Sequence, residues 1–263
     1  MEKVVSHMRV YYFDEDAPPI PAIENLIHEV FYNEQGLEVR RENIDETVEY
    51  FYERISSRLI REVHDYPGGK RKVTTFTYDH DANLVVCHMK EYQVKNGYGD
   101  YLIIPTGAFS EEYYDWSNKG KTCTRTKENH FTDGTVSKEL RREEYNDLGW
   151  LRRVHHFDED FQYESCEAMH YHYPDGILVL KMQRSVFTTK DGERREIRSR
   201  VRYAGDDMRV ISEENYGVNA EGKLFSNEFF YECEDDEEGN WIVSRKLKNG
   251  KVQCTLVREI EYW

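Results

Sequence analysis

Apolar and polar residues alternate along much of the chain, with a period of two. In the segment 193–203, Ile197 and Val201 fall on one parity. Arg198 and Arg200 fall on the other. Because successive side chains of a β-strand point to opposite faces, this segment is expected to pack one face and expose the other to water. The alternation predicts antiparallel strands rather than amphipathic helices.

A short phrase punctuates these alternating segments: an aromatic residue, then acidic or amide residues, then glycine, then an apolar residue. The copies run from Tyr32 to Leu37, Tyr145 to Trp150, Tyr216 to Leu224 and Cys233 to Trp241, with looser copies at 78–84, 173–177 and 203–206. Each copy predicts a β-turn between two strands. The spacing leaves strands of roughly 6 to 9 residues and no room for crossover helices, which indicates an antiparallel meander.

The composition supports an all-β fold with little thick core. The chain has 20 Tyr and 12 Phe, and 33% of its residues are charged. Aromatic residues suit a pleated, half-buried surface, whereas so many charges suit a sheet with water on much of both faces. We therefore expect one elongated domain over residues 1–263, an antiparallel β-meander of tandem hairpin repeats with roughly twelve to sixteen strands. The sheet is expected to be open or curled and partly single-layer.

Two segments interrupt this simple pattern. Residues 43–64 fit either a helix capped by Asn43 or two strands, and the surrounding repeats favour two strands. Residues 96–121 contain several glycines and break the rhythm, so they predict a seam or an insertion within the domain. The final residues predict three consecutive strands, at roughly 229–234, 241–248 and 251–262, joined at Gly239-Asn240 and Asn249-Gly250.

The net charge and the cysteines exclude several classes of function. A net charge of −15 disfavours binding to nucleic acid or to anionic membranes, since both need a basic surface. The five cysteines are odd in number and include no C-x-x-C pair, which argues against disulfides and zinc knuckles. No long apolar stretch indicates a signal peptide or a membrane span. The expected location is cytoplasmic, or secreted or on the cell surface if a leader has been removed.

The C-terminal run from Phe230 to Tyr262 resembles RHS/YD-repeat proteins, in particular their Bacteroidetes type. Gly239-Asn240-Trp241, Asn249-Gly250-Lys251 and Arg258-Glu259-Ile260 carry the resemblance. Cys233 and a longer acidic run stand where that family has tyrosine and aspartate. The resemblance implies an open β-meander that serves as a shell, stalk or surface protein without catalysis.

Three groups of residues are candidates for a reactive or ligand-binding site. A metal could use one of His155 and His156 with His170 and His172, together with a carboxylate; Asp158, Asp160 and Cys166 lie between the two pairs. The acidic run from Glu232 to Gly239 could bind calcium, and two of the many carboxylates could hydrolyse a glycoside. The simpler interpretation is that the histidines pack among aromatic residues and the acidic run is a solvated turn. We therefore assign no catalytic, cofactor-binding or metal-binding residue and expect no cofactor.

The favoured function is a non-catalytic scaffold or binding module for protein–protein interaction. A protein partner or a second copy would pair with its exposed edge strands. One alternative is a carbohydrate- or small-ligand-binding surface protein with an aromatic concave face, and another is a hydrolase on a β scaffold. Closure of the sheet discriminates between them, because a closed barrel with a central pocket favours ligand binding and an open sheet favours interaction.

Overall fold

The computed structural model describes residues 4–15, 17–96, 101–117, 120–157, 163–172, 178–188, 193–204, 209–218 and 222–263. These residues form 18 strands and one short 3₁₀ helix, η1 (Ile23–Asn25). The strands are β1 (Val5–Asp14), β2 (Leu26–Tyr32), β3 (Glu38–Asn43), β4 (Thr47–Tyr52), β5 (Leu59–Asp65), β6 (Lys70–Tyr78), β7 (Leu84–Asn96), β8 (Tyr101–Ser117), β9 (Thr122–His130), β10 (Val136–Tyr145), β11 (Leu151–Phe157), β12 (Tyr163–His172), β13 (Leu180–Thr188), β14 (Arg194–Ala204), β15 (Arg209–Val218), β16 (Leu224–Asp235), β17 (Trp241–Lys248) and β18 (Lys251–Tyr262).

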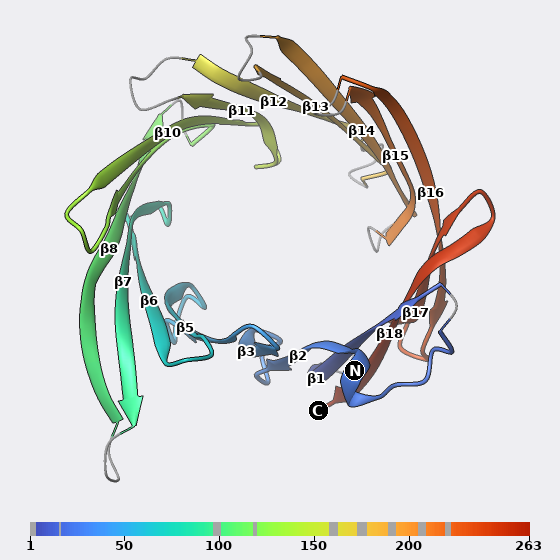
Figure 1. The fold of residues 1–263 in the computed structure, drawn as a ribbon, viewed down its shortest axis with the longest axis horizontal. Helices are drawn as coiled ribbons and strands as arrows, with labels where there is room; N and C mark the ends of the chain where they lie inside the picture. Colours follow the sequence, from blue (N-terminus) through green and yellow to red (C-terminus); the bar gives the residue numbers. More distant parts are fainter. Residues whose placement is uncertain are drawn as a thin grey trace.

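The strands form a closed barrel. Each strand pairs antiparallel with the next one in the sequence, as β2 does with β3 and β16 with β17. The first strand also pairs with the last, placing Met8 opposite Ile260 and Val10 opposite Arg258. Figure 1 shows the resulting ring, with the two chain ends close together. The prediction of an all-β antiparallel meander is confirmed.

The prediction of an open or curled sheet is wrong, and so is the partnership through exposed edge strands. The β1–β18 pairing joins residues more than two hundred positions apart and leaves no edge at either end of the meander. The described sheet also has 18 strands, more than the twelve to sixteen expected. Local alternation and turns determine each pairing with the next strand, whereas closure depends on the twist accumulated around the whole sheet.

The recurring phrase forms one kind of turn. In four copies, a side-chain oxygen accepts hydrogen bonds from two backbone N–H groups further along the turn; these residues are Asn33, Asp79, Asn146 and Asp236. The residue three positions further on then adopts a positive φ; it is glycine in three copies, as at Gly36 with 75°, and Ala82 in the fourth, with 72°. This is the geometry of a hairpin with a bulge after the turn. The looser copies at 173–177 and 205–206 lie outside the described residues.

The three C-terminal strands are confirmed as β16, β17 and β18. Asn249 and Gly250 have φ values of 55° and 74°, so both central residues of that turn lie in the left-handed region, as a type I′ turn requires. The preceding turn differs, because only Gly239 has a positive φ there. Asp236 rather than Asn240 organises it, by accepting the backbone N–H groups of Glu238 and Asn240.

Aromatic side chains bridge the seams between consecutive hairpins. At each of four such junctions, a tyrosine hydroxyl or a tryptophan N–H donates a hydrogen bond to a backbone carbonyl on the preceding hairpin. That carbonyl belongs to the first residue after the turn of the preceding hairpin. The pairs are Tyr52 to Glu38 at 2.8 Å, Tyr78 to Leu59 at 2.7 Å, Trp116 to Leu84 at 2.8 Å and Tyr171 to Leu151 at 2.5 Å. The aromatic residue that opens a turn phrase can therefore also hold a neighbouring hairpin in place.

The two segments that interrupted the pattern both form strands. Residues 43–64 contain β4 and β5, so the prediction of two strands is confirmed. Most of 96–121 forms β8, a strand of 17 residues that pairs with both β7 and β9. The description of the chain as one domain, with a seam or insertion at 96–121, stays a prediction.

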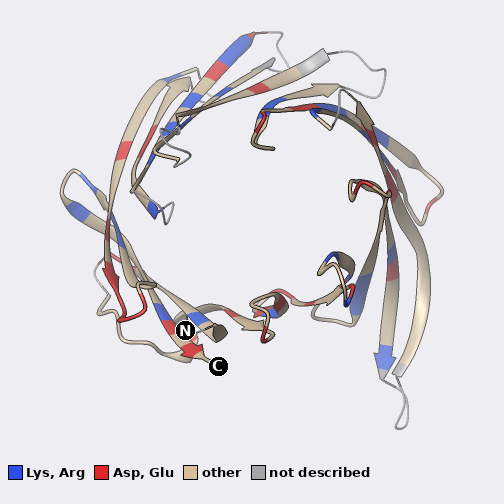
Figure 2. Cartoon of the chain, turned by 180° about the vertical axis from the view of Figure 1, so that it is seen from behind, with Lys and Arg blue, Asp and Glu red and all other residues tan. Residues whose placement is uncertain are grey.

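The barrel has a crowded inner face and a more open outer face. Residues paired across neighbouring strands share a face, so the register assigns every strand position to one side. On the face that includes Glu112 and Glu143, these two residues are only 7% and 5% exposed. On the opposite face, the side chains of Arg184 and Arg198 are 53% and 50% exposed. The concave side of a curved sheet brings side chains together, so the first face is the inner one. Charged residues occur around the whole ring (Figure 2).

Candidate functional site

The inner wall at β8–β10 carries paired charges. Glu112 forms an ion pair with Arg125, and Arg141 forms one with Glu143 at 2.5 Å. The Tyr114 hydroxyl donates to Glu112 at 3.0 Å, and the Arg125 guanidinium lies 5.6 Å from the Tyr114 ring centre. Burial raises the pKa of Tyr114 to about 12, so its hydroxyl stays protonated. The interior surface here is polar and its charges are neutralised in pairs.

The interior as a whole suits polar solutes. A barrel of eight strands is filled by its own side chains, whereas barrels of 16 to 18 strands leave an aqueous interior. The 18 strands described here are in the second class. Besides charged groups, the register places aromatic side chains on the inner face; they include Tyr50, Tyr52, Tyr78, Tyr114, Trp116, Tyr145, Tyr171 and Tyr231.

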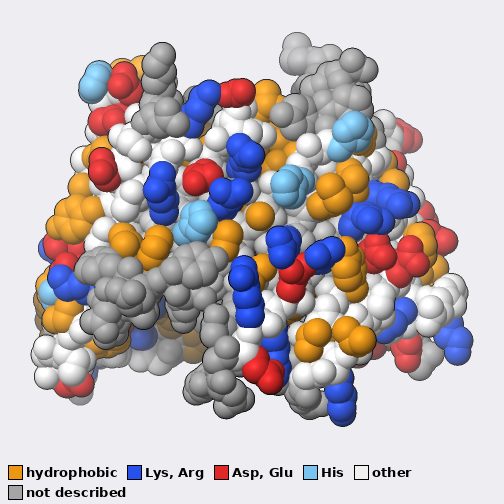
Figure 3. All heavy atoms as spheres, turned by 90° about the horizontal axis from the view of Figure 1, so that it is seen from above, with side chains coloured by type: hydrophobic (Ala, Val, Ile, Leu, Met, Phe, Trp, Pro, Cys, Tyr) orange, Lys and Arg blue, Asp and Glu red, His pale blue; other side chains and the backbone are white. Residues whose placement is uncertain are grey.

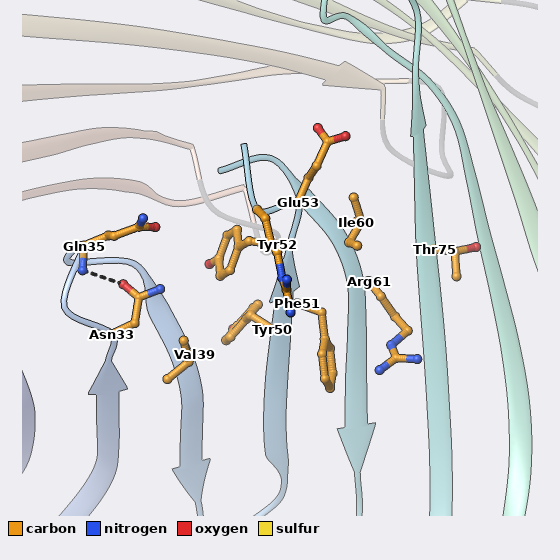
Figure 4. A pocket seen from close by; sticks show the side chains of 11 residues that line it. Asn33, Gln35, Val39, Tyr50, Phe51, Tyr52, Glu53, Ile60, Arg61 and Thr75 are labelled. Atoms are coloured by element: carbon orange, nitrogen blue, oxygen red, sulfur yellow. Dashed lines mark hydrogen bonds between the residues drawn. The ribbon is translucent and has the colours of Figure 1, made fainter. Parts of the chain in front are cut away.

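A separate pocket opens in the wall between β3 and β4. The ladder between these strands ends at Arg40 and Glu49, although β3 begins at Glu38 and β4 continues to Tyr52. The cavity at this split is about 720 Å³ (Figure 4). Its lining comes from β3 to β6 and two turns: Asn33, Gln35, Val39, Tyr50, Phe51, Tyr52, Glu53, Arg54, Ile60, Arg61 and Thr75.

We call this cavity between β3 and β4 the seam pocket. Its side chains can stack on a ligand and form hydrogen bonds with it. The Arg61 guanidinium lies 3.9 Å from the centre of the Phe51 ring, which makes a rigid cation–π platform. Burial, followed by the nearby charge of Glu38, raises the pKa of Tyr50 to about 12 and keeps its hydroxyl neutral. The lining carboxylate of Glu53 accepts a hydrogen bond from Ser56. The arrangement favours binding over acid–base chemistry.

His64, on the inner face of β5, contacts two carboxylates through its imidazole ring. His64 Nδ1 is 2.9 Å from Glu46 Oε2, and its Nε2 is 3.4 Å from Glu62 Oε2. Hydrogen bonds to Glu62 and then to Glu46 raise the pKa of His64, against the opposing effect of burial. These contacts hold the end of the β3–β4 turn to β5 most strongly when the imidazole is protonated.

The histidines weighed as metal ligands are divided between the two faces. His155, His170 and His172 lie on the outer face and His156 on the inner face. Cys166 lies opposite His155, while Asp158 and Asp160 are outside the described residues. Nowhere in the described ranges do three or more His, Cys, Asp or Glu side chains gather closely enough to hold a metal ion.

In the acidic run from Glu232 to Gly239, Asp236 accepts hydrogen bonds within its turn and Glu234 forms an ion pair. Asp236 accepts the two turn N–H groups and also a hydrogen bond from the Tyr262 hydroxyl. Glu234 lies 2.5 Å from Arg245 on the neighbouring strand. All five cysteines are free, and burial raises the pKa of Cys123 to about 11, which leaves that thiol unreactive near neutral pH.

Sequence reasoning did not find the seam pocket. Its residues come from four strands, and its existence depends on where the β3–β4 ladder stops, which no local pattern encodes. The run Tyr50-Phe51-Tyr52 was a signal of an aromatic site, but alternation alone places those rings on two faces.

Comparisons with known proteins find distant structural neighbours only. No family model matches the chain, and no curated protein matches it. A porin-like protein from Bacteroides vulgatus ATCC 8482 is similar with a TM-score of 0.44 and 11% identity, covering 99% of both chains. A porin-like protein from Bacteroides uniformis ATCC 8492 is similar with a TM-score of 0.42 and 12% identity, covering 98% of both chains. Likeness this distant transfers no role to the present chain.

The closed sheet overturns two further expectations. The resemblance to open RHS/YD-repeat meanders is wrong, because the pairing of β1 with β18 closes the sheet. The exclusion of a membrane span is also overturned, because it rested on the lack of a long apolar stretch, and closed barrels cross bilayers with alternating strands instead. Among the described residues, no helix is both long and apolar enough to cross a membrane.

Proposed function

We propose that this chain is a non-catalytic, porin-like barrel whose lumen admits polar solutes, as a passage or as a receptacle. The observation that carries the proposal is the closure of the 18-stranded sheet around an inner wall of tyrosines and paired charges. A barrel this wide keeps water inside, and a polar wall lets solutes replace that water at little cost in solvation.

The chemistry of the outer face determines whether the barrel can lie in a membrane and so let solutes cross it. Barrels embedded in lipid present an apolar band about 25 Å tall to the acyl chains. Here outward strand positions include ion-paired residues, for example Arg9 with Glu29 and Arg71 with Asp65. A cell-surface or outer-membrane location is therefore a separate part of the proposal, and its test is separate from the test of access to the lumen.

Thiol labelling tests access to the lumen, with the chain's own cysteines as probes. We would compare single-cysteine variants that keep Cys233 on the inner face or Cys166 on the outer face. A small charged methanethiosulfonate should label both thiols, whereas a maleimide on a wide polymer should label only Cys166. A third variant that keeps only Cys123, whose pKa is raised by burial, should stay unlabelled and serves as the control. An unreactive Cys233 with the small reagent would contradict an open lumen.

Planar bilayer recordings then separate a passage from a receptacle. If the barrel conducts across a membrane, the purified chain should give stepwise conductances in bilayers. A small methanethiosulfonate should reduce them in the variant that retains Cys233 but not in the variant that retains Cys166. Labelling of Cys233 without any conductance would assign the lumen to binding rather than to transport.

The seam pocket supports a second candidate, the binding of a neutral carbohydrate. Its aromatic rings can stack on the apolar face of a sugar, while the side-chain amides of Asn33 and Gln35 can bond to hydroxyls. Calorimetric titration with neutral oligosaccharides tests this. Tyr50→Ala should weaken any binding at least tenfold, whereas Tyr113→Ala on the outer face should not change it.

A further inference from the structure

A strip of arginines lies on the outer wall at β13 and β14. It consists of Arg184 on β13 and of Arg198, Arg200 and Arg202 on β14. The side chains of Arg184, Arg198 and Arg200 are 53%, 50% and 39% exposed, and Arg202 is also exposed. Figure 3 looks onto this part of the outer wall and shows Lys and Arg side chains gathered across it. We call these four residues the basic strip.

The basic strip brings like charges together with few counter-charges. Arg184 and Arg198 are direct cross-strand partners, an arrangement that destabilises a sheet when both side chains carry the same charge. Both guanidinium groups contact the single carboxylate of Glu196, Arg184 at 2.6 Å. Arg200 lies 3.2 Å from Glu214. Three of the four arginines thus share two carboxylates, on a protein whose net charge is −15.

Apolar side chains alternate with the arginines on the same face. Met182 is the cross-strand partner of Arg200 and is 38% exposed. Leu180 is the partner of Arg202 and is half-buried. Guanidinium groups and flexible apolar side chains therefore share one face of the β13–β14 pair. Arginine forms bidentate hydrogen bonds with phosphate, and methionine and leucine can enter the apolar layer just beneath lipid headgroups.

We infer that the basic strip docks the outer wall of the barrel onto an anionic lipid surface, where its guanidinium groups hold headgroup phosphates. The inference is independent of what enters the lumen. It also reverses an exclusion drawn from the net charge, because a strongly acidic chain can still carry a local basic footprint once β13 and β14 lie side by side.

Vesicle co-sedimentation of the full chain tests the inference. Wild type should bind vesicles of phosphatidylcholine with phosphatidylglycerol, should not bind phosphatidylcholine alone, and should dissociate as sodium chloride is raised. Each arginine at such a surface contributes roughly fivefold in affinity. The variant Arg184→Gln/Arg198→Gln/Arg200→Gln should therefore lose on the order of a hundredfold. Unchanged binding by this variant overturns the inference.

A matched control separates a local strip from the overall charge. The variant Lys90→Gln/Lys95→Gln/Lys251→Gln removes the same charge from exposed positions elsewhere and should bind almost as wild type does. Equal losses in the two triple variants would show that binding follows net charge only, and would overturn the strip as a site.

Two more measurements keep the test decisive. If the glutamine variant does not fold, as judged by circular dichroism, the three arginines are changed to lysine, which keeps the charge but removes the bidentate fork. Binding should then fall severalfold, and unchanged binding would contradict phosphate clamping. Inorganic phosphate should compete no better than sodium chloride of equal ionic strength. Displacement at much lower phosphate would assign the strip to free phosphate and overturn the lipid surface.

Discussion

Two adjacent glycines in the β5–β6 turn provide a sharp test of the barrel geometry. Gly68 and Gly69 both have a φ of 83°, so an alanine at either position is strained. Their surroundings differ. A Cβ on Gly68 would meet nothing within 4 Å, whereas a Cβ on Gly69 would lie 2.3 Å from the backbone oxygen of Val94. Val94 also donates its N–H to the Gly69 carbonyl at 2.6 Å.

The expected losses follow from these two environments. The left-handed conformation costs an L-residue about 1–2 kcal/mol, and this applies equally to Gly68→Ala and Gly69→Ala. At Gly69 the new methyl group would also push the turn away from β7. That movement breaks the hydrogen bond from Val94, which contributes about 0.5–1.5 kcal/mol, and disturbs the packing around it. We expect Gly69→Ala to destabilise the barrel by about 1–3 kcal/mol more than Gly68→Ala.

Urea unfolding followed by tryptophan fluorescence measures both losses, with unfolding midpoints in the order wild type, Gly68→Ala, Gly69→Ala. Hydrogen exchange adds a local readout, since the Val94 amide should exchange faster in Gly69→Ala only. Equal losses in the two variants, or an unchanged rate at Val94, would refute the close approach of the turn to β7.

Three other predictions follow from single contacts. Tyr78→Phe removes the hydroxyl that donates to the Leu59 carbonyl and should cost about 0.5–1.5 kcal/mol in urea unfolding; no loss would mean that the bridge does not hold its seam. Gly250→Val should destabilise by about 1–3 kcal/mol more than Gly250→Asn, because asparagine tolerates positive φ, and equal losses would argue against the type I′ turn. The raised pKa of His64 should stabilise the barrel below about pH 6.5, an effect lost as the pH rises through the folded-state pKa. His64→Gln should therefore lower Tm more at about pH 6 than at about pH 9, and a loss independent of pH would contradict this.

The sequence predicted the local structure of this protein well, because turns and alternation are local signals. Asn33 and Asp236 each organise a turn through their own side chain and the next few backbone N–H groups. The alternation at 193–203 likewise placed Arg198 and Arg200 on one face and Ile197 on the other, as the register of β14 confirms. These predictions needed no knowledge of distant residues.

Features that depend on two distant segments could not be predicted. Closure requires Val10 to meet Arg258, and the seam pocket requires the β3–β4 ladder to stop at Arg40. The basic strip requires Arg184 and Arg198 to be partners, a matter of register between two strands. The net charge of the chain could not reveal the basic strip, because a sum over all residues does not show where the charges lie.

Closure also explains how so highly charged a chain can form a stable sheet. An open single-layer sheet would leave unpaired backbone groups at two edges and would leave its tyrosines poorly covered. Joining β1 to β18 pairs those edges and curves the sheet, which crowds the inner face until Glu112 and Glu143 are nearly buried beside their arginines. At β13 and β14 the outer face stays exposed and free to carry charge. The same curvature therefore gives the polar, paired interior proposed for solutes and the exposed arginines inferred to hold phosphate, so a variant that opens the β1–β18 seam should impair both.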